Sequence, residues 1–218
     1  MNKYHVASIA LLVSFIILAI LVSPRTGQDN SPLIVQDRSV FLQVNNSHYS
    51  ALNQPMIFLT KYGREFVWPA ATALIFVFGG RTGRRAAVMM AIAMLISIPV
   101  ASVAKEIVAR PRPIIPLSDF LIGAGSDFSF PSGHAIVVSA GAGVALAMFR
   151  GSSRRTAVSL VLAAEAALVG ISRVYVGGHY PLDVVGGILL GLAIAFIVVG
   201  FSKQIDSLFR SVVKTSRS

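Results

Sequence analysis

The stretch from Ile171 to Asp183 places three side chains with complementary chemistry between two apolar runs. A guanidinium such as that of Arg173 can hold a phosphate, and an imidazole such as that of His179 can attack phosphorus or carry a proton. The carboxylate of Asp183 follows the histidine closely, so it can bind one ring nitrogen and leave the other free. Taken alone, these residues fit an ordinary charged turn between two helices equally well.

A second candidate group begins at Lys105. Arg112 follows it along the chain, and a proline on each side of the arginine restricts the backbone to extended geometry. One point charge and one planar guanidinium together suit a phosphate with several anionic oxygens. The alternative is that both cations reach toward lipid headgroups from the end of an apolar helix. For Glu106 and Arg110, between them, we expect charge balance or headgroup contact.

The third group is Pro131-Ser132-Gly133-His134, immediately before an apolar run. Ser132 is a typical N-cap residue, and Gly133 allows close approach to the backbone, so free amides at the helix start can bind an oxyanion. His134 falls in the first turn of this helix. That position makes it a candidate general acid, although a lone histidine more often has a structural role.

The elements that must position these groups are apolar helices. The 218 residues are 55% hydrophobic and 13% charged, and the mean hydropathy is +0.74, which indicates an integral membrane protein. We predict an all-α polytopic fold, with six transmembrane helices in one bundle and a single domain over residues 1–218. The predicted helices cover residues 6–22, 64–80, 86–104, 132–149, 156–172 and 182–202. The first is expected to be a retained helix rather than a cleaved signal peptide.

Charge and composition exclude several classes of protein. The formal net charge is +10, but the basic residues gather at 81–85, at 150–155 and after the last apolar run, as the positive-inside rule predicts. We therefore expect membrane lipids, not nucleic acid, as the surroundings. The chain has no cysteine, which excludes disulfides, thiolate metal sites and a cysteine phosphoenzyme. The sequence has no aspartate-rich pair and no histidine cluster with metal-ligand spacing.

The basic loops also predict the orientation in the cell membrane. They place both chain ends on the cytoplasmic side, so the loop 105–130, the start of the fourth helix and the turn 173–181 share the external face. Three segments distant in sequence are thus expected to meet at one level. Residues 203–218 are predicted to form an amphipathic basic helix on the inner leaflet, or a frayed end of the last span.

Other polar and aromatic residues receive structural interpretations. Residues 24–61 are predicted to form an external loop with an interfacial helix, and Trp68 to lie at headgroup level. Glu165 is an acid in the middle of a predicted span. A charge there is costly, so we expect it to be protonated or hydrogen-bonded inside the bundle, or otherwise to influence Arg173.

In order and spacing, the three groups resemble the motifs of the type 2 phosphatidic acid phosphatase superfamily. The resemblance rests on Lys105 with Arg112-Pro113, on Pro131-Ser132-Gly133-His134, and on Ser172-Arg173 followed by His179 and Asp183. The sequence departs from the family at none of these motif positions. The six-helix layout agrees over nearly the whole chain.

The resemblance implies a role for each residue. His179 would be the nucleophile that forms a phosphohistidine, Asp183 would orient it, and His134 would protonate the leaving oxygen and later help to activate water. The phosphoryl oxygens would be held by Lys105, Arg112, Ser132, Gly133 and Arg173. The chemistry of the family is independent of metals, so the resemblance implies neither a metal nor another cofactor.

We therefore predict a lipid phosphatase whose substrate is a lipid phosphate or diphosphate at the external leaflet. A polyprenyl diphosphate, such as undecaprenyl or dolichyl diphosphate, is the first choice, and phosphatidylglycerophosphate or phosphatidate is the second. A phosphotransferase would share every catalytic residue. The alternative of another class is a membrane protein that binds or transports an anion without turnover.

Overall fold

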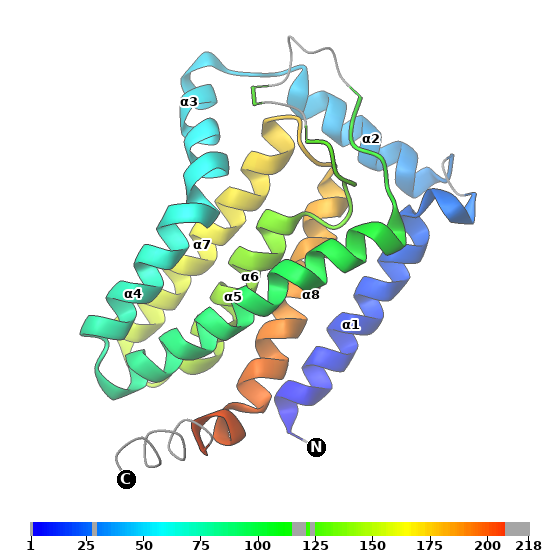
Figure 1. The fold of residues 1–218 in the computed structure, drawn as a ribbon. Helices are drawn as coiled ribbons and strands as arrows, with labels where there is room; N and C mark the ends of the chain where they lie inside the picture. The colour runs from blue at the N-terminus through cyan, green and yellow to red at the C-terminus, as the bar shows by residue number, and fades with distance from the viewer. Residues whose placement is uncertain (1, 28–29, 115–120, 123–124, 208–218) are drawn as a thin grey trace.

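The computed structural model describes residues 2–27, 30–114, 121–122 and 125–207, and its elements are helical throughout these ranges (Figure 1). The α-helices are α1 (Lys3–Val22), α2 (Pro32–Asn45), α3 (Ser50–Phe58), α4 (Trp68–Phe78), α5 (Gly80–Val108), α6 (Gly133–Met148), α7 (Ser153–Tyr175) and α8 (Pro181–Gly200). A 3-10 turn, η1 (Pro24–Thr26), follows α1, and a π-helix, η2 (Leu59–Val67), joins α3 to α4 without a break.

The helices agree with the membrane prediction in its general form. Among the described residues, α1, α5, α7 and α8 are long and apolar enough to cross a bilayer, and α6 is apolar but shorter. The predicted span 64–80 is divided, because residues 64–67 belong to η2, residues 68–78 form α4, and the span ends at the turn into α5. A π-helix has no distinctive composition, so the sequence did not indicate this division.

Helix α6 lies in the middle of the bundle (Figure 1) and is buried over most of its length. Its alanines and glycines allow neighbouring backbones to approach closely, as in other membrane helix pairs. The glycines of α8 match them: a Cβ at Gly187 would lie 2.8 Å from the Ser132 carbonyl oxygen, and one at Gly191 would lie 3.0 Å from the Ala140 nitrogen. This contact fixes the start of α6 against the start of α8.

The segment between α1 and α4 is more ordered than a loop with one interfacial helix. Helix α2 lies across the end of the bundle where α7 ends and α8 begins (Figure 1). Its Phe41 is 2% exposed and belongs to a small apolar cluster with Ala135, Val174 and Val184. Helix α2 is therefore a structural cap over the ends of three bundle helices.

The structure corrects the predicted position of Trp68. Instead of lying at headgroup level it is fully buried, and its indole N–H donates to the Glu165 carboxylate of α7. Gly141 of α6 provides the space, because a Cβ at that position would overlap the indole ring. The interpretation of Glu165 as an acid hydrogen-bonded inside the bundle is confirmed.

Part of the predicted C-terminal tail can be compared with the structure. Residues 202–207 are helical, whereas residues 208–218 lie outside the described residues. The amphipathic helix predicted over residues 203–218 therefore stays a prediction.

Candidate active site

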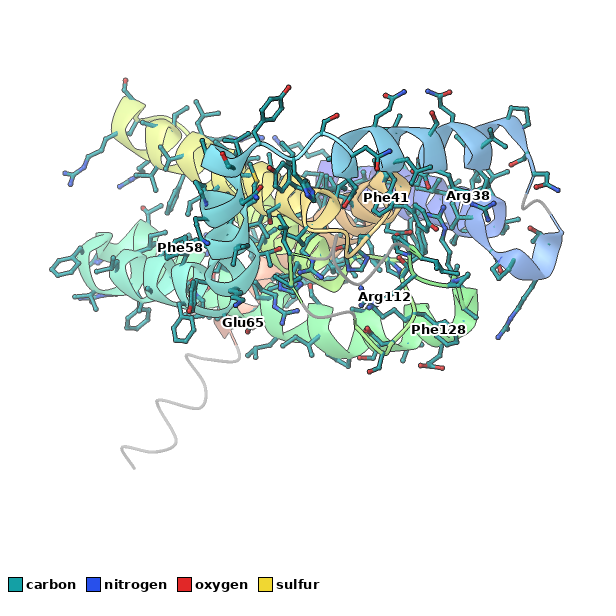
Figure 2. The ribbon with its side chains drawn as sticks, turned by 90° about the horizontal axis from the view of Figure 1, so that it is seen from above. Arg38, Phe41, Phe58, Glu65, Arg112 and Phe128 are labelled. Carbon is teal, nitrogen blue, oxygen red and sulfur yellow. The ribbon has the colours of Figure 1, made fainter. Side chains whose placement is uncertain are left out.

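The three sequence groups meet at one end of the bundle, as expected. They come from the end of α5, the start of α6 and the turn between α7 and α8, and Arg112 lies near the centre of the molecule in the view from above (Figure 2). They enclose a cavity of about 300 Å³, whose lining includes Lys105, Arg112, Gly133, His134, Arg173 and His179. Ser132 and Asp183 are fully buried and lie behind this lining.

A folded turn positions His179. The backbone N–H groups of Gly178 and His179 both donate to the Arg173 carbonyl oxygen, at 3.1 Å each, and Gly177 adopts a φ of 83° that favours glycine. The imidazole is 1% exposed. This burial lowers the pKa of His179 to about 4, although the neighbouring Asp183 favours the protonated ring. At neutral pH the ring is uncharged, so it has a lone pair available for attack.

Asp183 faces the same imidazole from the first turn of α8. Its Oδ2 lies 3.6 Å from Nδ1 of His179, and the Ser129 hydroxyl oxygen lies 3.5 Å from that nitrogen. Ser129 also donates to Oδ2, and the Tyr180 backbone N–H donates to it at 2.8 Å. Because Nδ1 faces Asp183 and Ser129, Nε2 is the nitrogen left for a substrate.

Arg110 and Asp37 extend this network, and the sequence analysis missed both as site residues. Arg110 is 4% exposed, and its guanidinium donates to Oδ1 of Asp183 and to Oδ2 of Asp37, at 2.6 Å each. It balances charge, as one interpretation held, but it does not contact headgroups. Asp37, from α2, also accepts a hydrogen bond from the Leu182 backbone N–H at 2.9 Å. Burial raises the pKa of Asp37, against the opposing effect of Arg110.

The outer part of the site is a pair of cations held by a carboxylate. Lys105 donates to the Phe128 carbonyl oxygen at 2.8 Å and to Asp127. Arg112 donates to the Gly178 carbonyl oxygen at 2.6 Å, to the Asp127 carbonyl oxygen at 2.9 Å and to the Asp127 carboxylate. Partial burial opposes ionisation of Asp127, but the hydrogen bonds from both cations hold its pKa well below the usual range. Asp127 thus binds both of the cations that a phosphate would use.

Arg173 is fixed by a residue that the sequence analysis also missed. Its Nη1 donates to the Thr60 hydroxyl of η2 at 3.1 Å, and the same hydroxyl accepts from Ser172 at 3.1 Å. Nε of Arg173 is buried and has no partner among the described residues. The guanidinium therefore retains a donor for an incoming anion.

The start of α6 keeps its amides available. Ser132 is the N-cap by position, as predicted, but its side chain makes no capping bond and its hydroxyl has no partner within the described part of the chain. The first-turn amides at Gly133 and His134 are therefore not blocked by the cap. A helix start of this kind suits an oxyanion that enters the cavity.

Little in the sequence could have revealed the missed residues. Arg110 stands inside the first motif, so its position was a weak signal, whereas Asp37, Thr60 and Asp127 lie in segments without a motif. In the described ranges, no group of three histidine or acidic side chains is arranged to hold a metal ion. The arrangement combines a neutral imidazole, a buried carboxylate behind it and several cations in front. It can support transfer of a phosphoryl group to His179.

Comparison with known proteins agrees with this chemistry. A family model described as the PAP2 superfamily matches residues 83–206. The chain is 37% identical to the undecaprenyl-diphosphatase of Sulfolobus acidocaldarius, over 95% of this chain and 94% of the relative. It is 27% identical to the undecaprenyl-diphosphatase BcrC of Bacillus subtilis, over 77% and 83% of the two chains. A solved structure, the PAP2-type phosphatidylglycerolphosphate phosphatase of Bacillus subtilis, superposes with a TM-score of 0.71 at 27% identity, covering 91% and 96%.

Proposed function

This chain belongs to the PAP2 superfamily of membrane lipid phosphatases, and we propose that it hydrolyses a polyprenyl diphosphate to the corresponding monophosphate. The observation that carries the proposal is the buried, uncharged imidazole of His179, with Asp183 behind it and a cationic cavity in front. A protein that only binds an anion needs the cations but has no need of an oriented neutral imidazole. The similarity to two undecaprenyl-diphosphatases supports the choice of substrate.

The proposed mechanism has two steps. Nε2 of His179 attacks the distal phosphorus in line with the bridging oxygen, and the bond to that oxygen breaks to give phosphohistidine and a lipid monophosphate. Lys105, Arg112 and Arg173 bind the equatorial oxygens, together with the Gly133 amide, and Ser132 supports the start of α6 from behind the cavity lining. His134 donates a proton to the leaving oxygen where one is needed, then accepts one from the water that hydrolyses the phosphohistidine.

We also propose the orientation that the basic loops predict. The end of α5, the start of α6 and the turn after α7, which line the cavity, lie at the end of the bundle opposite the start of α1 and the end of α8 (Figure 1). Arg81, Arg85 and Lys203 line a separate cavity near the N-terminus. Basic loop residues at the end opposite the motifs support six crossings with both termini in the cytoplasm and the active site on the external side.

Phosphate release by the purified protein in detergent tests the proposal. Undecaprenyl diphosphate, phosphatidylglycerophosphate and phosphatidate are compared in excess EDTA, the second because a similar solved structure is a phosphatidylglycerolphosphate phosphatase. We expect the highest kcat/KM for the diphosphate and no loss of activity in EDTA. His179→Ala should lower kcat by about 10⁴-fold or more while still binding vanadate. Full activity in that variant would exclude the proposed nucleophile.

A further inference from the structure

The cationic cavity adjoins a larger apolar cavity. The second space is about 720 Å³ and lies between α4 and α5, which meet near Gly79 and diverge toward the site (Figure 1). Its apolar walls include Ala73, Phe76 and Val77 of α4 and Ala91, Met94 and Leu95 of α5. The two cavities share three lining residues, Arg64, Ile98 and Val137. Arg64 is the only charged residue of the three.

This arrangement limits how a lipid diphosphate can lie. The distal phosphate must reach His179 in the cationic cavity, and the hydrocarbon chain gains most by lying against the apolar walls between α4 and α5. The phosphate attached to the chain then falls at the junction between the two spaces. That is where the Arg64 guanidinium lies.

The Arg64 side chain has the geometry of an anion ligand at this junction. Its Nε donates to Glu65 at 2.8 Å, and its Nη2 contacts the same carboxylate oxygen. In the described residues no hydrogen bond uses Nη1, which would lie 3.9 Å from a Cβ built on Gly133 at the start of α6. The side chain is 31% exposed and Glu65 is 48% exposed. Glu65 lies where α4 faces α5 in the view from above (Figure 2). Because both side chains are partly exposed, the carboxylate orients the guanidinium without burying it.

Resting on the proposed function, we infer that Arg64 binds the chain-side phosphate and makes the enzyme prefer diphosphates over monophosphates. When Nε2 of His179 bonds to the distal phosphorus, the bond from that phosphorus to the bridging oxygen breaks and its electron pair stays on this oxygen. The negative charge of the leaving lipid monophosphate therefore increases next to Arg64. A lipid monophosphate has no second phosphate at this position, so its hydrolysis gains nothing from Arg64.

The test compares farnesyl diphosphate with farnesyl monophosphate, which share one chain. Arg64→Gln should lower kcat/KM for the diphosphate by about 10- to 100-fold and change the value for the monophosphate by less than about twofold. Arg64→Lys should fall between, because it keeps the charge and loses the planar fork. The matched control is Arg81→Gln, which removes the same charge from the opposite end of the bundle and should alter neither substrate.

A second measurement does not depend on monophosphate turnover. Inorganic pyrophosphate and orthophosphate are used as competitive inhibitors of the wild type and of Arg64→Gln, and only inhibition by pyrophosphate should weaken. Equal losses on both farnesyl substrates, or unchanged inhibition by pyrophosphate, would overturn the inference about Arg64 alone. If the wild type releases no phosphate from the diphosphate, the proposed function fails as well. Both kinetic outcomes are read only for variants whose chemical denaturation in detergent matches that of the wild type, so an unfolded variant is recognised independently of activity.

Discussion

The inner and outer halves of the site hold their charges in different ways. The inner half consists of Asp37, Arg110 and Asp183, each 4% exposed or less, with every carboxylate bound to the same guanidinium. The outer half consists of Lys105 and Arg112, which share Asp127, a carboxylate with a 54% exposed side chain. Lys105 and Arg112 are themselves only 10% and 16% exposed, so the difference lies in the carboxylates. A buried carboxylate is costly to separate from its cation, whereas a half-exposed one can turn to solvent. The inner half is therefore built to stay fixed behind the nucleophile, and the outer half can exchange its carboxylate for a phosphate.

Breaking the inner half should have the largest effect on stability. Arg110→Met leaves two carboxylates buried without a cation, and we expect the free energy of unfolding to fall by about 3–5 kcal/mol, with loss of phosphatase activity. Chemical denaturation in detergent measures the change. Adding Asp37→Asn to this variant should restore part of the stability, because one of the unpaired acids is removed. A single variant as stable as the wild type would show that the network is not structural.

Ser129→Ala weakens the inner half more gently. The substitution removes the hydroxyl that donates to Asp183 and lies near Nδ1 of His179. We expect kcat to fall by about tenfold, equivalent to about 1.4 kcal/mol, with KM nearly unchanged. Ser159→Ala is a matched control, because its hydroxyl bonds only to the Thr156 carbonyl oxygen far from the site. A rise in KM with no change in kcat would instead indicate a role in substrate binding.

Asp127→Asn tests the exchangeable character of the outer half. Removing this carboxylate frees Lys105 and Arg112, so vanadate should bind a few-fold more tightly and KM should fall. The free energy of unfolding should fall by less than in Arg110→Met, because Asp127 is half exposed whereas Asp37 and Asp183 are buried. Inhibition by vanadate and denaturation are measured on the same preparation. Weaker vanadate binding would mean that Asp127 organises the two cations instead of competing for them.

The smallest expected effect is that of pH on the nucleophile. Because burial lowers the pKa of His179 to about 4, the ring takes up a proton only in acid, and activity should rise with pH through this value. Between pH 7 and pH 5 the neutral fraction changes by only about one tenth. The pH profile of kcat/KM checks this expectation. The ionisation of the substrate phosphate is measured separately by phosphorus NMR, and its contribution is removed from the profile. An acid limb near pH 6.5 would indicate an ordinary, solvated histidine.

The same contrast explains what could be predicted from the sequence. His134, His179 and Asp183 stand in motifs at the ends of apolar runs, so their convergence followed from helix count and charge. Asp37 had no such signal, because it lies in a segment that looked like a loop and pairs with Arg110, 73 residues further along the chain. Long-range side-chain pairs of this kind depend on the packing of helices, which hydropathy does not describe.

The predicted helices show where hydropathy is sufficient. Long apolar runs such as residues 182–202 gave α8 to within two residues at either end. The run at 64–80 concealed a change from π- to α-helix at Trp68. Hydropathy also could not tell which face of α4 turns inward, so the indole was assigned to the headgroups, where tryptophan is common.

Because Asp37 lies on α2, the design of chimeras between relatives must take this helix into account. The segment matched by the family model begins at residue 83, after α2, Thr60 and Arg64. A chimera that transplants only this segment would carry every motif into a foreign N-terminal half, where Arg110 and Arg173 meet partners that did not evolve with them. Active hybrids should therefore require that α2 and η2 travel with the motif-bearing helices α5 to α8.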